Sequence, residues 1–176
     1  MTMAKKAAHV GIVMGSDSDL DVLREAINVL TRLGISHEVV VASAHRTPAR
    51  AKKYAEEAEG RGIRVLIAGA GGAAALPGFL ASLTSLPVIG VPINATPLGG
   101  LDALLSIAQM PKGVPVATVA VGKWGATNAG ILAAQILALS DSVVKKRLAA
   151  YRRSMAAEVD ERSRRVAQQL RGERRK

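Results

Sequence analysis

The sequence predicts an α/β fold in which helices cover both faces of a parallel sheet. Short runs rich in Val and Ile alternate along the chain with longer stretches of helical apolar spacing. Small-residue loops follow several of these runs, and 176 residues suit a single domain, residues 1–176, with a sizeable core. A doubly wound, flavodoxin-like three-layer sandwich with right-handed crossovers is the simplest architecture for this alternation.

The apolar pattern also predicts where the elements lie. We expect strands at residues 9–14, 37–42, 64–68, 87–91 and 115–121. We expect helices at residues 19–33, 47–60, 76–83, 101–109, 126–139 and 141–170. Gly34 is placed to end the first helix, while Thr47 and Pro48 are typical of a helix N-cap and first helical residue. The Ala- and Leu-rich helix at 126–139 is apolar on nearly all sides, which predicts burial.

The last predicted helix is longer than one small domain needs. It carries an intermittent apolar stripe: Val143, Val144, Leu148, Tyr151, Met155, Val159, Val166 and Leu170. We therefore expect residues 141–176, a long C-terminal helix and basic tail, to pack on another subunit of a homo-oligomer. A simple surface helix is the alternative.

Composition excludes several classes of protein. There is no cysteine, and the three histidines lack the spacing and partners of a zinc site, so we expect neither a disulfide nor a metal. No apolar run is long enough for a membrane span, and the N-terminal residues lack the apolar stretch of a signal peptide. These features favour the cytoplasm.

The net charge of +10 is concentrated at the C-terminal end of the chain. From Asp141 onward, twelve Lys or Arg stand against five Asp or Glu, which leaves +7. Phosphate neutralisation in a nucleic acid is one interpretation of this excess. A solvated helix face explains it better, because Tyr151 is the only aromatic residue there that could stack on a base.

Two loops carry polar side chains that suit an anionic, phosphorylated ligand. Ser16 and a new helix N-terminus offer donors for phosphate, and Asp19 suits ribose hydroxyls. In the second loop, Ser43-Ala44-His45-Arg46, an arginine can grip phosphate and an imidazole can move a proton near neutral pH. A helix cap from Ser18 or Asp17, and a turn at His45, are the structural alternatives.

A third loop, residues 69–75, has almost no side-chain bulk, so its backbone can approach a ligand closely or wall off a small dry cavity. Ordinary tight packing of a βα turn is the alternative. We expect Lys123 and Trp124 to lie in a surface loop, and His9 and His37, at strand starts, to be structural.

Four segments in order resemble the N5-carboxyaminoimidazole ribonucleotide mutases of purine biosynthesis, the PurE family, in its class I-like form. They are G-S-D-S-D from Gly15, S-A-H-R-T-P from Ser43, G-A-G-G-A-A-A-L-P-G from Gly69 and Q-M-P-K-G-V-P-V from Gln109, within a resemblance that spans about residues 10–139. The resemblance implies an isomerase of the same fold, a homo-octamer with active sites near subunit contacts, and no cofactor. It assigns Ser16, Asp19 and Arg46 to the ribose 5-phosphate portion of the substrate. It makes Ser43, Ala70, Gly71 and Leu76 lining residues, and His45 the proton-transfer residue.

Two positions depart from the family pattern. Ala75 stands where the family usually has His, and Trp124 where Ala is commoner. An alternative activity is aminoimidazole ribonucleotide carboxylase, which uses free carbon dioxide, but its loop usually reads G-R-S-N where this chain has G-A-G-G. A divergent, non-catalytic nucleotide or nucleic-acid binder is the alternative from another class.

Overall fold

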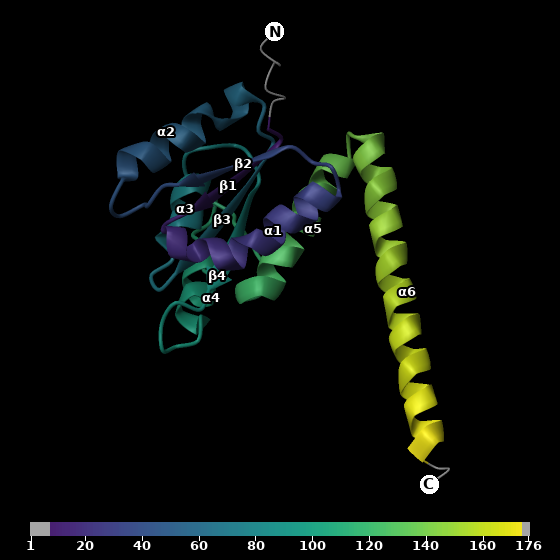
Figure 1. Ribbon diagram of the computed structural model, residues 1–176. Helices are drawn as coiled ribbons and strands as arrows, with labels where there is room; N and C mark the ends of the chain where they lie inside the picture. Colours follow the sequence, from purple (N-terminus) through teal and green to yellow (C-terminus); the bar gives the residue numbers. More distant parts are fainter. Residues whose placement is uncertain (1–7, 174–176) are drawn as a thin grey trace.

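The computed structural model describes residues 8–173, and five parallel strands form one sheet in this part of the chain. The strands are β1 (Val10–Met14), β2 (His37–Val41), β3 (Val65–Gly71), β4 (Val88–Ile93) and β5 (Ala117–Thr118), in the order β2-β1-β3-β4-β5. Chain and sheet order thus diverge at β1, as in a doubly wound sheet. The predicted fold class is confirmed (Figure 1).

Helices cover both faces of the sheet. They are α1 (Leu20–Arg32), α2 (Pro48–Ala58), α3 (Ala75–Ala81), α4 (Leu101–Ala108), α5 (Gly122–Ala138) and α6 (Ser142–Glu173), with short 3-10 turns η1 (Asp17–Asp19) and η2 (Glu59–Arg61). One buried cluster joins α1, α5 and the start of α6 to the sheet, and a second joins α2, α3 and α4 to its other face. The sheet therefore lies between two separate apolar layers.

Small residues let α5 pack closely against α1. A Cβ atom at Gly130 would lie 2.9 Å from the Cβ of Val29, so the two helices approach too closely for a larger residue there. The end of α1 follows the prediction: Gly34 has a φ of 65°, and the next N–H, from Ile35, donates to Leu30 O at 2.9 Å. This packing fixes the helix whose first turn borders the polar loops.

The strand boundaries differ from prediction at two places. β3 continues through Gly71, not Ala68, because Gly69, Ala70 and Gly71 pair in register with β4. The small-residue loop is therefore partly strand. β5 contains only two residues, since it pairs with β4 only at Ala117 and Thr118, and Pro115 has no N–H to extend the ladder.

Two helix predictions also need correction. α2 starts at Pro48 as expected, but it ends at Ala58, and the left-handed residue beyond the following turn is Gly62, not Gly60. α5 begins at Gly122, so Lys123 lies in a helix, where its ammonium pairs with Asp21 at 3.0 Å. The predicted surface loop at this position is wrong.

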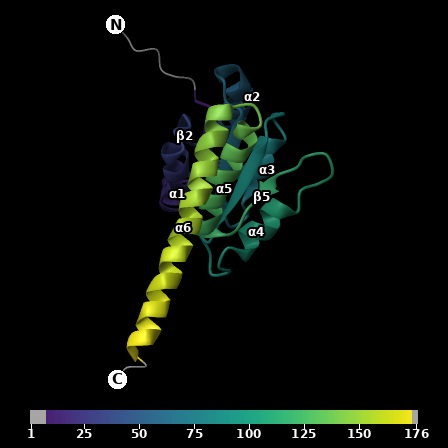
Figure 2. The ribbon, with the colours of Figure 1, turned by 90° about the vertical axis from the view of Figure 1, so that its right-hand side faces the viewer.

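Helix α6 leaves the body of the molecule after its first turns (Figures 1 and 2). Val144 and Leu148 are buried in the cluster with α5, whereas Met155, Val159 and Val166 are exposed. The three last residues of the basic tail, 174–176, lie outside the described part, as do residues 1–7. Within residues 8–173, no helix combines the length and apolar character needed to cross a membrane.

Candidate active site

The loop after β1 forms a capping box at the start of η1. The Ser16 hydroxyl oxygen accepts the Ser18 N–H at 3.4 Å, and Asp19 Oδ2 accepts the Ser16 N–H at 3.1 Å. The cap is thus Ser16, where the sequence suggested Ser18 or Asp17. Asp19 is only 8% exposed, and burial raises its pKa although backbone N–H groups and the Arg46 charge oppose that shift. A largely buried carboxyl group is therefore held at the edge of this loop.

The loop after β2 is organised by Ser43. Its hydroxyl accepts the Arg46 N–H at 3.1 Å, and its own N–H donates to the Thr47 hydroxyl at 2.9 Å. Thr47 therefore bonds back into the loop and does not cap α2 with its side chain, contrary to the prediction. The Arg46 guanidinium donates to Gly15 O at 2.8 Å, which ties this loop to the loop after β1.

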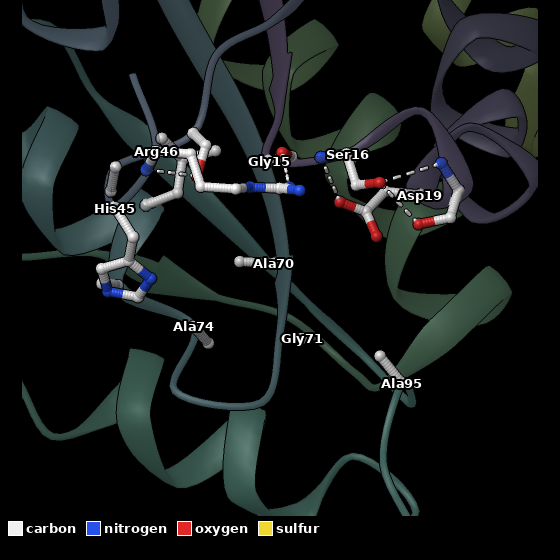
Figure 3. Close-up of a pocket in the computed structure, with 14 residues that line it drawn as sticks. Gly15, Ser16, Asp19, His45, Arg46, Ala70, Gly71, Ala74 and Ala95 are labelled. Atoms are coloured by element: carbon white, nitrogen blue, oxygen red, sulfur yellow. Dashed lines mark hydrogen bonds between the residues drawn. The ribbon is translucent and has the colours of Figure 1, made fainter. Parts of the chain in front are cut away.

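Figure 3 shows how the charged side chains lie around one hollow. Arg46 reaches toward Gly15, with His45 on one side and Asp19 on the other. Within residues 8–173, no hydrogen bond restrains the exposed His45 imidazole. The ring is consequently free to reorient.

The loop between β3 and α3 supplies a wall of small residues. Gly72 has a φ of 61° and Ala74 a φ of 42°, so two residues near each other adopt the left-handed conformation. This conformation is uncommon for alanine and persists only where surrounding structure holds it. The Ala74 N–H donates to Gly71 O at 3.1 Å, which closes the turn.

A fourth loop, residues 94–100 after β4, completes the site and was missed from the sequence. A Cβ at Gly71 would lie 2.6 Å from the Cβ of Ala95, so the two loops touch. The signal was present, because Ala95 follows an apolar strand at the same sheet edge as the other three loops. The loop carries no charged residue or histidine, and this concealed it.

These loops surround a cavity of about 340 Å³, at the lower end of the range for small-molecule sites. All eight residues proposed from the sequence line it: Ser16, Asp19, Ser43, His45, Arg46, Ala70, Gly71 and Leu76. Other lining residues include Ala44, Ala74, Ala75 and Ala95. Lys123 does not line this cavity. Among the described residues, no three His, Asp or Glu side chains converge to hold a metal.

Known proteins match this chain over most of its length. The family model for AIR carboxylase matches residues 9–158. The chain belongs to the AIR carboxylase family. It is 53% identical to N5-carboxyaminoimidazole ribonucleotide mutase of Pyrococcus horikoshii, over 94% of this chain and 93% of the relative. It is 60% identical to the Pseudomonas aeruginosa protein of that name, over 74% of this chain and 80% of the relative.

The fold comparison agrees with the family assignment. The crystal structure of Treponema denticola PurE matches with a TM-score of 0.78 and 29% identity, covering 86% of this chain and 94% of that one. The predicted membership of the PurE family is therefore confirmed.

Proposed function

We propose that this chain is an isomerase of purine biosynthesis that converts N5-carboxyaminoimidazole ribonucleotide to 4-carboxy-5-aminoimidazole ribonucleotide. The observation that carries this proposal is one cavity lined by His45, Arg46 and Asp19, in a chain more than half identical to relatives named as that mutase. The cavity size suits one mononucleotide.

Each end of the substrate has a matching group in the cavity. Two side chains suit the 5-phosphate: Arg46 offers a charged guanidinium, and Ser16, in the loop at the start of the first helix, offers a hydroxyl. Asp19 accepts hydrogen bonds from the ribose hydroxyls. Ser43, Ala70, Gly71 and Leu76 line the remaining surface, with the small residues under the imidazole ring.

The proposed reaction moves a carboxylate without a cofactor. The bond between N5 and its carboxylate breaks, carbon dioxide is released, and the electron pair stays on the aminoimidazole. C4 then attacks the carbon dioxide to form the new carbon–carbon bond. His45 takes the C4 proton, which restores the aromatic ring, and N5 gains the proton that completes its amino group, so no proton is gained or lost overall. Holding carbon dioxide beside the ring and excluding water makes recapture faster than escape.

The rest of the molecule supports a single PurE-like domain that assembles with copies of itself. Met155, Val159, Val166 and Leu170 are exposed on α6, and we assign residues 141–176 to subunit contacts. We propose a homo-oligomer, as the octamer implied by the family resemblance, and a cytoplasmic location, where a purine pathway enzyme meets its substrate. Light scattering of the full chain tests the assembly, since a monomeric mass would contradict it.

The experiment that tests the function is conversion of N5-carboxyaminoimidazole ribonucleotide without ATP, metal or added bicarbonate. We expect the wild-type chain to form the 4-carboxy product under these conditions despite Ala75. The alternative carboxylase instead requires aminoimidazole ribonucleotide and carbon dioxide, so a rate that appears only with added bicarbonate would replace the mutase proposal. No turnover of either substrate by folded protein would favour the non-catalytic binder.

A further inference from the structure

The loop of residues 94–100 borders the cavity but is weakly attached to the body of the protein. Asn94, Ala95, Pro97 and Leu98 are all exposed, whereas Thr96 is half-buried. Backbone hydrogen bonds in the loop are local ones, such as Gly99 N–H to Thr96 O at 3.1 Å. The Ala95 N–H donates to Ile93 O at 2.9 Å at the end of β4, and the Thr96 side chain adds the attachment to α4.

The Thr96 side chain makes two hydrogen bonds. Its hydroxyl donates to Asp102 Oδ2 at 2.7 Å and accepts the Leu98 N–H at 3.2 Å. Its methyl carbon lies beside the small-residue wall, because a Cβ added at Gly72 would be 3.8 Å from it. One side chain thus links α4 to its own loop, next to the loop after β3.

Asp102 is a suitable anchor for this hydroxyl. It is the second residue of α4, where a negative charge interacts favourably with the helix N-terminus. The Thr96 hydrogen bond is the main cause that lowers the Asp102 pKa, followed by the Ala103 N–H. The carboxylate is therefore ionised at neutral pH, and a hydrogen bond to an ionised acceptor is stronger than one between neutral groups.

Thr96 follows Ala95 in the chain, and Ala95 lies on the cavity wall. The approach of Ala95 to Gly71 is too close for a Cβ at Gly71, so the two loops meet without a gap. Displacement of Ala95 would open the wall on the side of β4. A molecule as small as carbon dioxide would escape through such an opening more readily than a ribonucleotide would.

We propose that the hydrogen bond between Thr96 and Asp102 holds Ala95 against Gly71 and thereby retains carbon dioxide between its release and its recapture. Thr96 and Asp102 are positioning residues, since neither lines the cavity. This inference rests on the proposed mutase function. Escape leaves a defined product: N5 gains a proton from solvent, and aminoimidazole ribonucleotide and carbon dioxide accumulate in place of the 4-carboxy product.

The test measures how the substrate partitions between these two products. Single turnovers with enzyme in excess are run in buffer depleted of carbon dioxide, and spontaneous loss of carboxylate is subtracted using a sample without enzyme. Thr96→Val removes the donor, Thr96→Ser retains it, and Asp102→Ala removes the acceptor. Thr84→Val is the matched control, because its half-buried hydroxyl accepts the Leu86 N–H at 3.2 Å in a loop before β4, away from the cavity.

We expect Thr96→Val and Asp102→Ala each to raise the ratio of decarboxylated to 4-carboxy product by roughly tenfold to a hundredfold, the scale of losing one hydrogen bond to a charged group. The double variant should add little to either single change, since both break the same pair. Thr96→Ser and Thr84→Val should partition as wild type does.

Three results would overturn the inference, and they are distinguishable. If Thr96→Val turns over with the wild-type product ratio, the pair has no role in retention while the mutase function stands. If wild-type protein does not form the 4-carboxy product, both the inference and the function beneath it fail. A general loss of rate in all three Thr96 and Asp102 variants with an unchanged ratio would indicate a structural role only, and would also overturn it.

Discussion

Two cavities at opposite ends of the same sheet contain the same three kinds of side chain. At the carboxyl edge, about 340 Å³ is bordered by His45, Arg46 and Asp19. At the amino edge, about 290 Å³ is bordered by His9, Arg64 and Asp141. Residue types and volume alone therefore do not distinguish the candidate active site from its counterpart.

The backbone makes the difference between the two cavities. α2 and α3 begin at the carboxyl edge, where unpaired N–H groups and the positive end of each helix dipole favour an anion. The amino edge contains the ends of α1, α2 and α5, with their carbonyl groups. Only α6 begins there, and Asp141 already accepts the N–H groups of Val143 at 2.8 Å and Val144 at 3.1 Å. Helix polarity therefore favours the carboxyl edge as the end at which a phosphorylated ligand would bind.

Replacement of one histidine in each cavity should give the largest difference between the two cavities. His45→Asn should lower the rate of the mutase reaction roughly 10²- to 10⁴-fold, because it removes the proposed acceptor of the C4 proton. The matched change His9→Asn should leave the rate within experimental error of wild type. The rates are measured at saturating substrate, and an inactive His9→Asn protein with normal unfolding would contradict the assignment.

The sequence predicted this edge well because its signals are local and the topology brings them together. Ser16 and His45 each follow an apolar strand and Gly71 ends one, and a parallel sheet places the ends of β1, β2 and β3 side by side. The extent of β3 was harder to predict, since pairing of Gly69 and Gly71 depends on β4 and not on their own propensity.

Other features depend on contacts between distant segments. The role of Ala95 required the approach of two loops, and that of Lys123 required Asp21 from another helix. The outer half of α6 shows the opposite case: its helical pattern was readable, but nothing within residues 8–173 packs on Val159 or Val166. Local patterns predict an element, while its partner must come from the tertiary or quaternary structure.

The arginines should produce the next largest difference. Arg46→Ala should raise KM for the ribonucleotide roughly tenfold to a hundredfold, because hydrogen bonds to a charged group contribute about 1.5–3 kcal/mol. Arg64→Ala removes an equal charge at the amino edge, so it controls for the change in overall charge. Initial-rate kinetics at constant ionic strength measure both. Equal increases in KM for the two variants would mean that substrate binding depends on the total charge of the protein and not on Arg46 at the carboxyl edge.

The aspartates should show the smallest effect. Their contributions to stability should change with pH in opposite directions. Burial raises the Asp19 pKa above its ordinary 3.8, so its contribution to stability is full below 3.8 and is lost as pH rises through the folded-state value. Hydrogen bonds from Val144 and Val143 lower the Asp141 pKa, so its contribution is present above 3.8 and is lost as pH falls through the folded-state value. Asn at either position retains an amide oxygen to accept the local N–H but does not titrate.

Thermal unfolding of wild type, Asp19→Asn and Asp141→Asn across the acid range tests this sign difference. The stability of wild type relative to Asp19→Asn should decrease as pH rises, whereas its stability relative to Asp141→Asn should increase. Two differences that slope in the same direction would show that the ionised aspartates meet similar environments at the two edges. Burial would then not be the dominant influence on the Asp19 carboxylate.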